Sequence, residues 1–322
     1  MMNNLKQYPI ELSFPDLSKW KQGNCGVDYV YQFKSDNPGK HVMIMSLIHG
    51  NEISGALVVD RLLRDKLKPE RGTLTLGFAN VAAYEAFSPD APDATRFLEE
   101  DMNRVWDEKA LDGPRDSQEL RRARALRPIV DQVDLLLDLH SMHESDPAIM
   151  MGGYLKKGED LACRIGVPEY IVMDKGHKAG KRLRDYGDFG NPESPKAAIL
   201  FESGQHFEKH AYPAALDVAA RFLIVAGVVD RKTVEDYLLP TTVQKQKVVD
   251  ITEAVTIKTD KFRFADDFKG MQLIKKAGTI IAYDGDEEIK TPYDNCILVQ
   301  PSMRHARKGN TAVRLGHLLQ SE

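Results

Sequence analysis

Cysteine is scarce in this sequence, and the three that occur, Cys25, Cys163 and Cys296, lie far apart. An odd number of widely separated thiols argues against a disulfide framework or a cysteine-based zinc site and indicates a reducing compartment. Long apolar runs are missing as well, because no segment reaches the roughly 18 apolar residues of a membrane span. Residues 1–9 also lack the apolar core of a signal peptide. We therefore expect a cytoplasmic protein with no membrane partner.

An excess of basic charge is equally absent. Lysine and arginine total 44 and aspartate and glutamate total 48, so the formal net charge is −4. This balance provides no positive field for nucleic acid, and we expect no such partner. The hydrophobic content of 42% is ample for a large buried core. Association of identical chains stays open.

Apolar runs alternate with helix-type patterns through the first two thirds of the chain. The runs 42–48, 133–140 and 197–201 are typical of strands that are buried on both faces. Apolar residues recur with helical spacing over 53–66. We also expect strands over 73–79, 149–151 and 170–173 and helices over 117–132, 155–165 and 211–227. This alternation predicts an α/β fold with a mostly parallel central sheet and helices on both faces.

The pattern of expected secondary structure changes at Pro240. From there it consists of short β-type runs that Gly and Asp turns separate, such as 246–252, 254–257 and 311–315. We expect a larger domain over 1–240, followed by a smaller β-rich domain over 241–322 with the form of a barrel or a sandwich.

A histidine and a carboxylate follow the first apolar run, at His49 and Glu52. At a strand-to-helix junction, this spacing lets both side chains turn toward one cation. The pair alone is weak evidence, because His-x-x-Glu often arises by chance. His140 adds a third ligand, since it closes the second run and parallel sheets gather functional residues at the carboxyl ends of their strands. Three ligands leave a position open, which a catalytic zinc keeps for a water whose pKa it lowers to about 7.

The third apolar run ends in Glu202, a candidate general base. The alternative is a strand-end glutamate paired to a lysine or to backbone amides. Its position at a third strand end, beside the ligand candidates, favours the base.

Cationic groups stand in the long polar loop 88–113, which is of a length that is usually functional in a compact domain. Arg96 and Arg104 could hold a carboxylate or polarise a carbonyl, and Asn103 lies beside them. The alternative is an exposed loop whose charges pair with one another, as Arg96 with Glu99 or Glu100 would, and for this segment taken alone that alternative is favoured.

Two further residues have competing interpretations. His143 has ligand spacing from His140, although we expect it not to be a ligand. Asp138 lies two positions before His140, on the same face of the strand, so it could orient the imidazole of His140 or form a strand-end salt bridge.

Together these residues resemble the succinylglutamate desuccinylase and aspartoacylase family, which is related to the zinc carboxypeptidases. In that family, His-Gly-Asn-Glu gives two zinc ligands, Asp-Leu-Asn-Arg binds substrate, Asp-Leu-His gives the third ligand, and a later strand-end glutamate is the base. An arginine seven residues ahead of the asparagine contacts the scissile carbonyl. The matching positions here are His49 to Glu52, Asp101 to Arg104, Asp138 to His140, Glu202 and Arg96.

The resemblance implies a zinc-carboxypeptidase-like fold and one Zn²⁺ per chain, held by His49, Glu52 and His140. It implies a zinc-dependent amidohydrolase that cleaves a small N-acyl amino acid or a related N-acyl compound into a carboxylate and a free amine. Glu202 and Arg96 would be catalytic. Asn103 and Arg104 would bind substrate.

One position departs from the family pattern. Aspartoacylase has a further substrate-carboxylate arginine ten residues before the base, where this chain has Pro192. Arg182, Arg184 or Lys196 could replace it. The resemblance therefore implies the reaction and not a named substrate. Two other functions stay open: a metallocarboxypeptidase that acts on small peptides, and a zinc-binding protein without catalytic activity.

Overall fold

The computed structural model describes residues 6–176, 179–241, 243, 245–304 and 306–319. Its main feature is an 11-stranded mixed sheet in the order β1-β3-β2-β4-β7-β5-β6-β8-β14-β13-β10. In chain order, these strands are β1 (Val30–Lys34), β2 (His41–Ser46), β3 (Thr73–Phe78), β4 (Leu135–Met142), β5 (Ile149–Met151), β6 (Tyr170–Met173), β7 (Ala197–Gln205), β8 (Lys247–Thr256), β10 (Gln272–Ile274), β13 (Cys296–Val299) and β14 (Thr311–Leu318). The neighbouring strands β3, β2, β4 and β7 run parallel. The predicted α/β fold is confirmed.

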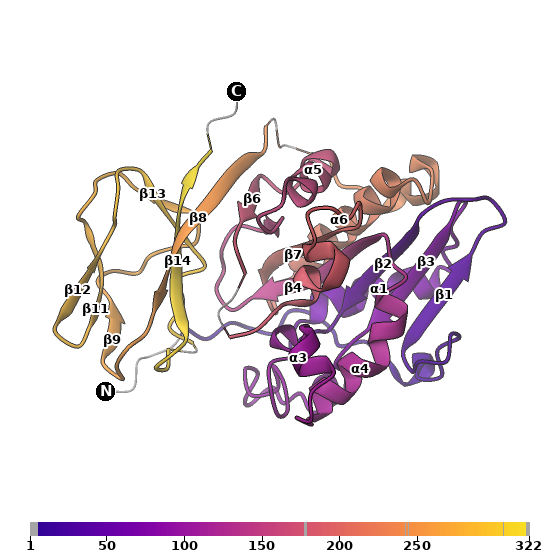
Figure 1. Ribbon diagram of the computed structural model, residues 1–322, viewed down its shortest axis with the longest axis horizontal. Coiled ribbons are helices and arrows are strands. Elements are labelled where there is room, and N and C mark those ends of the chain that lie inside the picture. Colours follow the sequence, from indigo (N-terminus) through magenta and orange to yellow (C-terminus); the bar gives the residue numbers. More distant parts are fainter. Residues whose placement is uncertain (1–5, 177–178, 242, 244, 305, 320–322) are drawn as a thin grey trace.

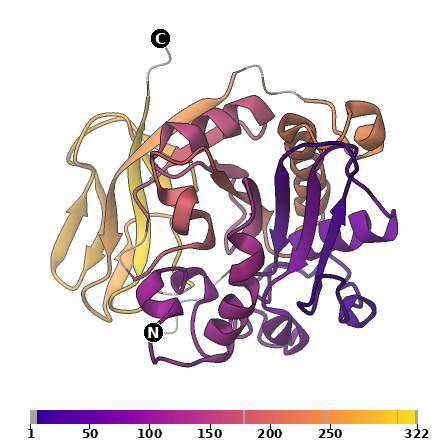
Figure 2. The same ribbon diagram turned by 45° about the vertical axis from the view of Figure 1, so that its right-hand side comes forward.

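Helices cover both faces of the parallel part of this sheet (Figures 1 and 2). One face packs against α1 (Ile53–Arg64), α5 (Lys156–Ile165) and α6 (Ala211–Ala226). The other packs against α3 (Glu108–Leu111) and α4 (Gln118–Val130). The remaining helical elements are short: α2 (Val81–Glu85), η1 (Ser18–Trp20), η2 (Met102–Arg104), η3 (Leu183–Asp185), η4 (Gly187–Gly190) and η5 (Arg231–Tyr237).

The continuous apolar runs exist because successive side chains of a strand point to opposite faces, and here both faces are buried. Along β2, Val42 and Ile44 pack on the side of α1 and α6. Met43 and Met45 alternate with them and pack on the side of α4. All eight residues of β4 are buried in the same way. A run without polar alternation was therefore a sound sign of a central strand.

The elements after Pro240 extend the large sheet. Strand β8 pairs parallel with β6 through its first residues and antiparallel with β14 along most of its length. The expected runs 246–252 and 254–257 are thus one strand. A separate three-stranded antiparallel sheet has the order β12-β11-β9, with β9 (Phe262–Phe264), β11 (Ile280–Asp284) and β12 (Glu287–Lys290).

An apolar cluster made of residues after Pro240 combines side chains of β9 and β11 with side chains of β8, β10, β13 and β14. Figure 1 shows the small sheet beside β14. A second cluster combines Val249, Ile297 and Val299 with side chains of β4, β5, β6 and β7. The C-terminal strands therefore pack directly on the core of the larger sheet. The division at residues 240 and 241 stays a prediction.

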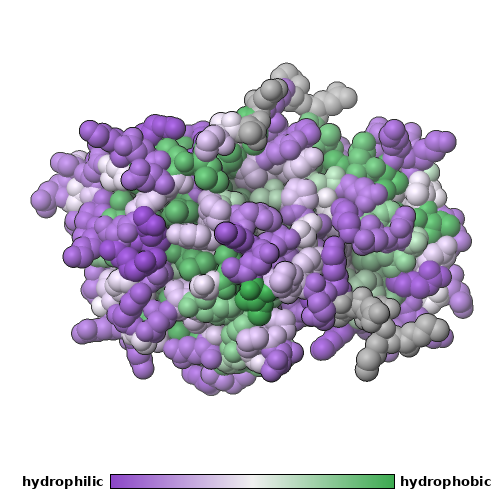
Figure 3. All heavy atoms as spheres, turned by 180° about the vertical axis from the view of Figure 1, so that it is seen from behind, coloured by the Kyte–Doolittle hydropathy of each residue, from purple (hydrophilic) through white to green (hydrophobic). Residues whose placement is uncertain are grey.

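No helix within the described ranges is both long and apolar enough to cross a membrane. Seen from behind, the molecule presents mainly hydrophilic residues at its surface, with apolar areas between them (Figure 3).

Candidate metal centre and active site

The loop after β2 carries two of the predicted ligands. It begins at Leu47, whose φ of 57° turns the chain out of the sheet, and it ends at Glu52, the N-cap residue of α1. Gly50 allows this loop to pack tightly, because a Cβ atom there would lie 2.4 Å from the carbonyl carbon of Ala83 and 2.6 Å from the Thr95 oxygen. The Gly50 amide donates a hydrogen bond to the Arg96 carbonyl at 3.0 Å. The ligand loop and the arginine loop are therefore joined through their backbones.

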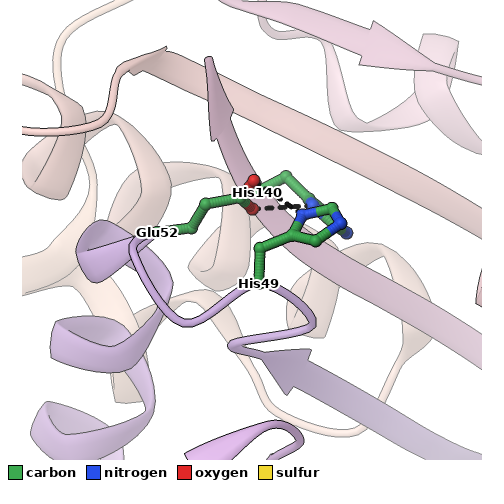
Figure 4. A group of neighbouring side chains, drawn as sticks. All are labelled: His49, Glu52 and His140. Carbon is green, nitrogen blue, oxygen red and sulfur yellow. Dashed lines mark hydrogen bonds and ion pairs between the residues drawn. The ribbon is translucent and has the colours of Figure 1, made fainter. Parts of the chain in front are cut away.

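His49, Glu52 and His140 meet at the carboxyl edge of the parallel strands (Figure 4). The Glu52 carboxylate lies between the two imidazoles, with Oε1 2.7 Å from Nδ1 of His49 and Oε2 2.7 Å from Nδ1 of His140. One ligand atom from each residue can be chosen so that all three lie within 4.8 Å of one another. All three side chains are at most 2% exposed. The structure thus brings the predicted ligand set together.

A second carboxylate lies behind each imidazole. Oδ1 of Asp101 is 2.9 Å from Nε2 of His49, and Oδ2 of Asp138 is 3.0 Å from Nε2 of His140. Both imidazoles thereby turn Nδ1 toward the centre of the group. Carboxylates in this position set the orientation of metal-binding histidines. Asp138 makes the contact with His140 that one of its two interpretations from the sequence required, whereas sequence reasoning gave Asp101 no such role.

The electrostatics of the group suit a cation. Burial would raise the pKa of Glu52, but the neighbouring His49 and His140 outweigh it and hold that pKa well below its ordinary value. Burial would lower the pKa of His140, but Asp138 and Glu52 raise it well above the usual value. An acceptor-rich environment that retains a proton on a buried imidazole can also hold a metal ion, which binds as the proton leaves.

The donor set gives a further test of the fit. Nδ1 of His49, Nδ1 of His140 and the Glu52 carboxylate face one another in a buried position. A single cation at this point could be bound by all three residues. Two imidazoles and one carboxylate are a common donor set for catalytic zinc. The residues present therefore fit one divalent ion.

Glu202 stands beside His140 across the β4–β7 pairing, in register with it. Its Oε1 accepts a hydrogen bond from Nε2 of Gln300 at 3.1 Å. Burial, with a further contribution from Glu52, raises the pKa of Glu202 to about 7, against the effect of His140. A carboxyl group with a pKa near neutrality is suited to accept and return a proton.

The arginine loop also reaches the site. Arg96 donates a hydrogen bond from Nη1 to Oε1 of Glu52 at 3.0 Å. Its Nη2 lies 3.9 Å from Oδ2 of Asp101, so its partner within the loop is Asp101 and not the expected Glu99 or Glu100. Asn103 accepts a hydrogen bond on Oδ1 from the Leu183 amide at 3.0 Å. This contact turns its Nδ2 group, a donor, the other way. Nη2 of Arg104 lies 3.9 Å from Oδ2 of Asp101.

All seven predicted site residues line one cavity of about 560 Å³. Its wall also includes residues from the C-terminal strands and loops, which sequence reasoning did not select: Gln300, Arg307 and Arg314. No local pattern marks them, because they follow β13 or lie on or before β14 and reach the cavity only through sheet pairing.

The structure separates the three candidates for the missing arginine. Arg182 lines the cavity, but it pairs with Asp174 and Asp185. Arg184 donates to backbone carbonyls of Gly152 and Ala198 and pairs with Asp185. Neither Arg184 nor Lys196 is part of the cavity wall.

His143 lies near the centre without joining the ligand group. Its Nδ1 is 3.0 Å from Nε2 of His206, whose Nδ1 is 2.8 Å from the Ser141 hydroxyl. Among the described residues, the group that could hold a metal ion contains His140 and not His143.

Comparison with known proteins gives consistent matches. The sequence-family model for the succinylglutamate desuccinylase/aspartoacylase catalytic domain matches residues 38–192 of this chain. A succinylglutamate desuccinylase from Vibrio vulnificus is 24% identical over 82% of this chain and 76% of its own length. An aspartoacylase from Xenopus tropicalis is 27% identical over 42% of this chain and 48% of its own length.

Solved structures share the fold. The succinylglutamate desuccinylase from Vibrio cholerae has a TM-score of 0.67 at 18% identity and covers 91% of this chain and 86% of its own. The product-bound structure of the ectoine utilization protein EutE from Ruegeria pomeroyi has a TM-score of 0.61 at 15% identity. The match covers 89% of this chain and 87% of the EutE chain.

Proposed function

Because the chain belongs to the succinylglutamate desuccinylase/aspartoacylase family, we propose that it is a zinc-dependent deacylase. It would hydrolyse the amide bond of an N-acyl amino acid or a related small N-acyl compound and release a carboxylate and a free amine. One observation carries this proposal: the candidate ligands, the candidate base and the cationic groups line the same cavity.

His49, Glu52 and His140 would hold the zinc ion, and their burial with converging Nδ1 and carboxylate oxygen atoms supports that role. A zinc ion bound there would polarise the acyl carbonyl and lower the pKa of water to about 7. Asp101 and Asp138 would keep both imidazoles in the ligating orientation.

Glu202 would act as the general base and acid. Its free oxygen, Oε2, is buried and accepts no hydrogen bond from the described residues, whereas Oε1 is taken by Gln300. Oε2 can therefore accept a proton from the attacking water and return it to the leaving amine. This double use requires a pKa near the working pH, which burial of Glu202 supplies.

Arg96 would donate to the acyl oxygen as negative charge develops on it. In the free protein its Nη1 already lies 3.0 Å from a ligand oxygen of Glu52, so the guanidinium is at the reacting centre. Asn103 and Arg104 would bind a carboxylate of the amino-acid portion through their N–H donors and thereby orient the amide bond.

Metal analysis combined with a substrate screen tests this function. Purified protein is incubated with a panel of N-acyl amino acids and with small peptides, with and without a chelator, and free amine is measured. We expect about one zinc per chain and chelator-sensitive release from acyl amino acids. The variant Glu202→Ala should retain the metal and lose turnover by about 10³-fold or more, because it removes the proton acceptor.

The alternatives predict other outcomes. Hydrolysis of peptides in preference to acyl amino acids would favour a metallocarboxypeptidase. Metal-replete protein that is inactive on the whole panel would favour a zinc-binding protein without catalysis. Full activity in Glu202→Ala would remove the base assignment.

A further inference from the structure

The two carboxylate oxygens of Glu202 have different surroundings. Oε1 accepts the Nε2 donor of Gln300 at 3.1 Å. Oε2 is buried and has no hydrogen-bond partner among the described residues. Gln300 follows strand β13, so a residue of the C-terminal part of the chain contacts a side chain of β7. One oxygen of Glu202 is thus held while the other is left for a reacting group.

The orientation of the Gln300 amide follows from its second partner. Nη1 of Arg314 lies 3.4 Å from Oε1 of Gln300. Because a guanidinium only donates hydrogen bonds, it selects the oxygen of the amide and turns the NH₂ group toward Glu202. Arg314 stands on β14, paired in register with Val299, the residue before Gln300. The sheet pairing therefore sets the distance between the two side chains.

Arg314 is itself anchored. Its Nε lies 3.5 Å from Oδ2 of Asp174, which is 3% exposed. Arg182 donates to the same oxygen of Asp174 through Nη1 at 3.2 Å, and the Gly176 amide donates to Oδ1 at 2.9 Å. A chain of contacts thus runs from Asp174 through Arg314 and Gln300 to Glu202. Because each of these side chains is held by its neighbour, the network restricts the orientation of the Glu202 carboxylate.

The backbone of Gln300 gives an independent sign of a special role. Its φ of 51° lies in the left-handed region, which residues other than glycine and asparagine seldom occupy. Such conformations persist where surrounding contacts over-determine them, and they cluster at functional sites.

We infer that Gln300 is a positioning residue for the deacylation, which holds Glu202 so that Oε2 faces the reacting centre, and that Arg314 orients Gln300 for this purpose. The inference rests on the proposed role of Glu202 as base. It makes the C-terminal strands part of the catalytic apparatus, because Gln300 follows β13 and Arg314 lies on β14.

Steady-state kinetics separates positioning from other roles. Gln300→Leu keeps the volume of the side chain and removes its donor, and we expect kcat to fall about 10- to 100-fold with KM changed less than threefold. A displacement of about 1 Å at a reacting group is sufficient for a loss of this size. Arg314→Met should lose a similar factor, and Arg314→Lys, which still donates, should recover part of it.

The controls address folding and additivity. Gln272 lies on strand β10 and is exposed, so Gln272→Leu should leave kcat and KM unchanged. All variants should bind the same amount of metal as the wild type. The double variant Gln300→Leu/Arg314→Met should be little worse than either single variant, because the two residues act through one contact.

Several results would overturn the inference. An unchanged kcat in Gln300→Leu would do so, and so would a large rise in KM with kcat retained, since that would make both residues substrate ligands. A crystal structure of Gln300→Leu supplies a readout that needs no substrate: we expect Glu202 in more than one conformer or turned from its wild-type position, and an unchanged single conformer would contradict the idea. Inactivity of the wild type on every acyl compound would instead count against the proposed function.

Discussion

The two carboxylates behind the imidazoles offer a quantitative test of the metal centre. Asp138 touches Nε2 of His140 at 3.0 Å and is completely buried, and Asp101 touches Nε2 of His49 at 2.9 Å with a side chain that is 19% exposed. Replacing either by asparagine keeps the shape of the side chain and removes its charge. Both changes should weaken zinc binding without altering the fold.

The size of the effect follows from the surroundings. Loss of such an orienting partner typically lowers metal affinity by about 10- to 100-fold, or about 1.4–2.7 kcal/mol. We expect Asp138→Asn near the upper end, because no water can replace the lost contact in a fully buried position. Asp101→Asn should lie near the lower end, since Asp101 is partly exposed and also accepts the Asn103 amide at 2.8 Å. The double variant should combine both losses, because the two carboxylates act on different ligands.

Competition with a chromophoric chelator measures the zinc affinity of each variant, and circular dichroism checks the fold. Asp217→Asn is a matched control: Asp217 is 9% exposed and pairs with Arg221 on α6, outside the cavity wall. It should change stability without changing zinc affinity. If Asp138→Asn binds zinc within about twofold of the wild type, the assignment of His140 as an oriented ligand is wrong.

Three other outcomes are expected. First, kcat/KM should rise with pH on the acid side of its profile, because Glu202 must be deprotonated to accept a proton. The pKa of Glu202, about 7, places the midpoint of this rise near neutrality, and a bound cation moves the midpoint to lower pH. A kcat/KM that falls from pH 5 to pH 7 would contradict the role of Glu202 as base. Second, Gly50→Ala should lower both the melting temperature and the metal content, since its Cβ would lie 2.4 Å from Ala83 backbone; native values for both would refute the close packing of this loop. Third, removal of the metal should lower the melting temperature, because a ligand at a free concentration of 100 times its Kd stabilises the folded state by about 2.7 kcal/mol. An identical melting curve with and without chelator would argue against a bound ion.

Much of the fold could be predicted because it depends on local patterns. The runs 42–48 and 133–140 became β2 and β4, since a strand buried on both faces leaves no polar alternation in the sequence. The N-cap at Ser117, whose side chain accepts the Leu120 amide, matches the expected start of α4. The short edge elements β9, β10 and β12 were missed, because three or four half-exposed residues carry no distinctive periodicity.

The main residues of the candidate site could be predicted from the sequence alone, because each of them follows an apolar strand pattern or lies in one polar loop. His49, His140 and Glu202 stand at the ends of apolar runs, and the parallel pairing of β2, β4 and β7 carries those ends to one edge. What only the tertiary structure decided is which distant groups meet there. Asp101, in the arginine loop, contacts Nε2 of His49. Gln300 contacts Glu202, and Arg314 contacts Gln300, because strand pairing joins the C-terminal segment to the sheet. Such contacts depend on register between segments far apart in the chain, and no local period encodes that register.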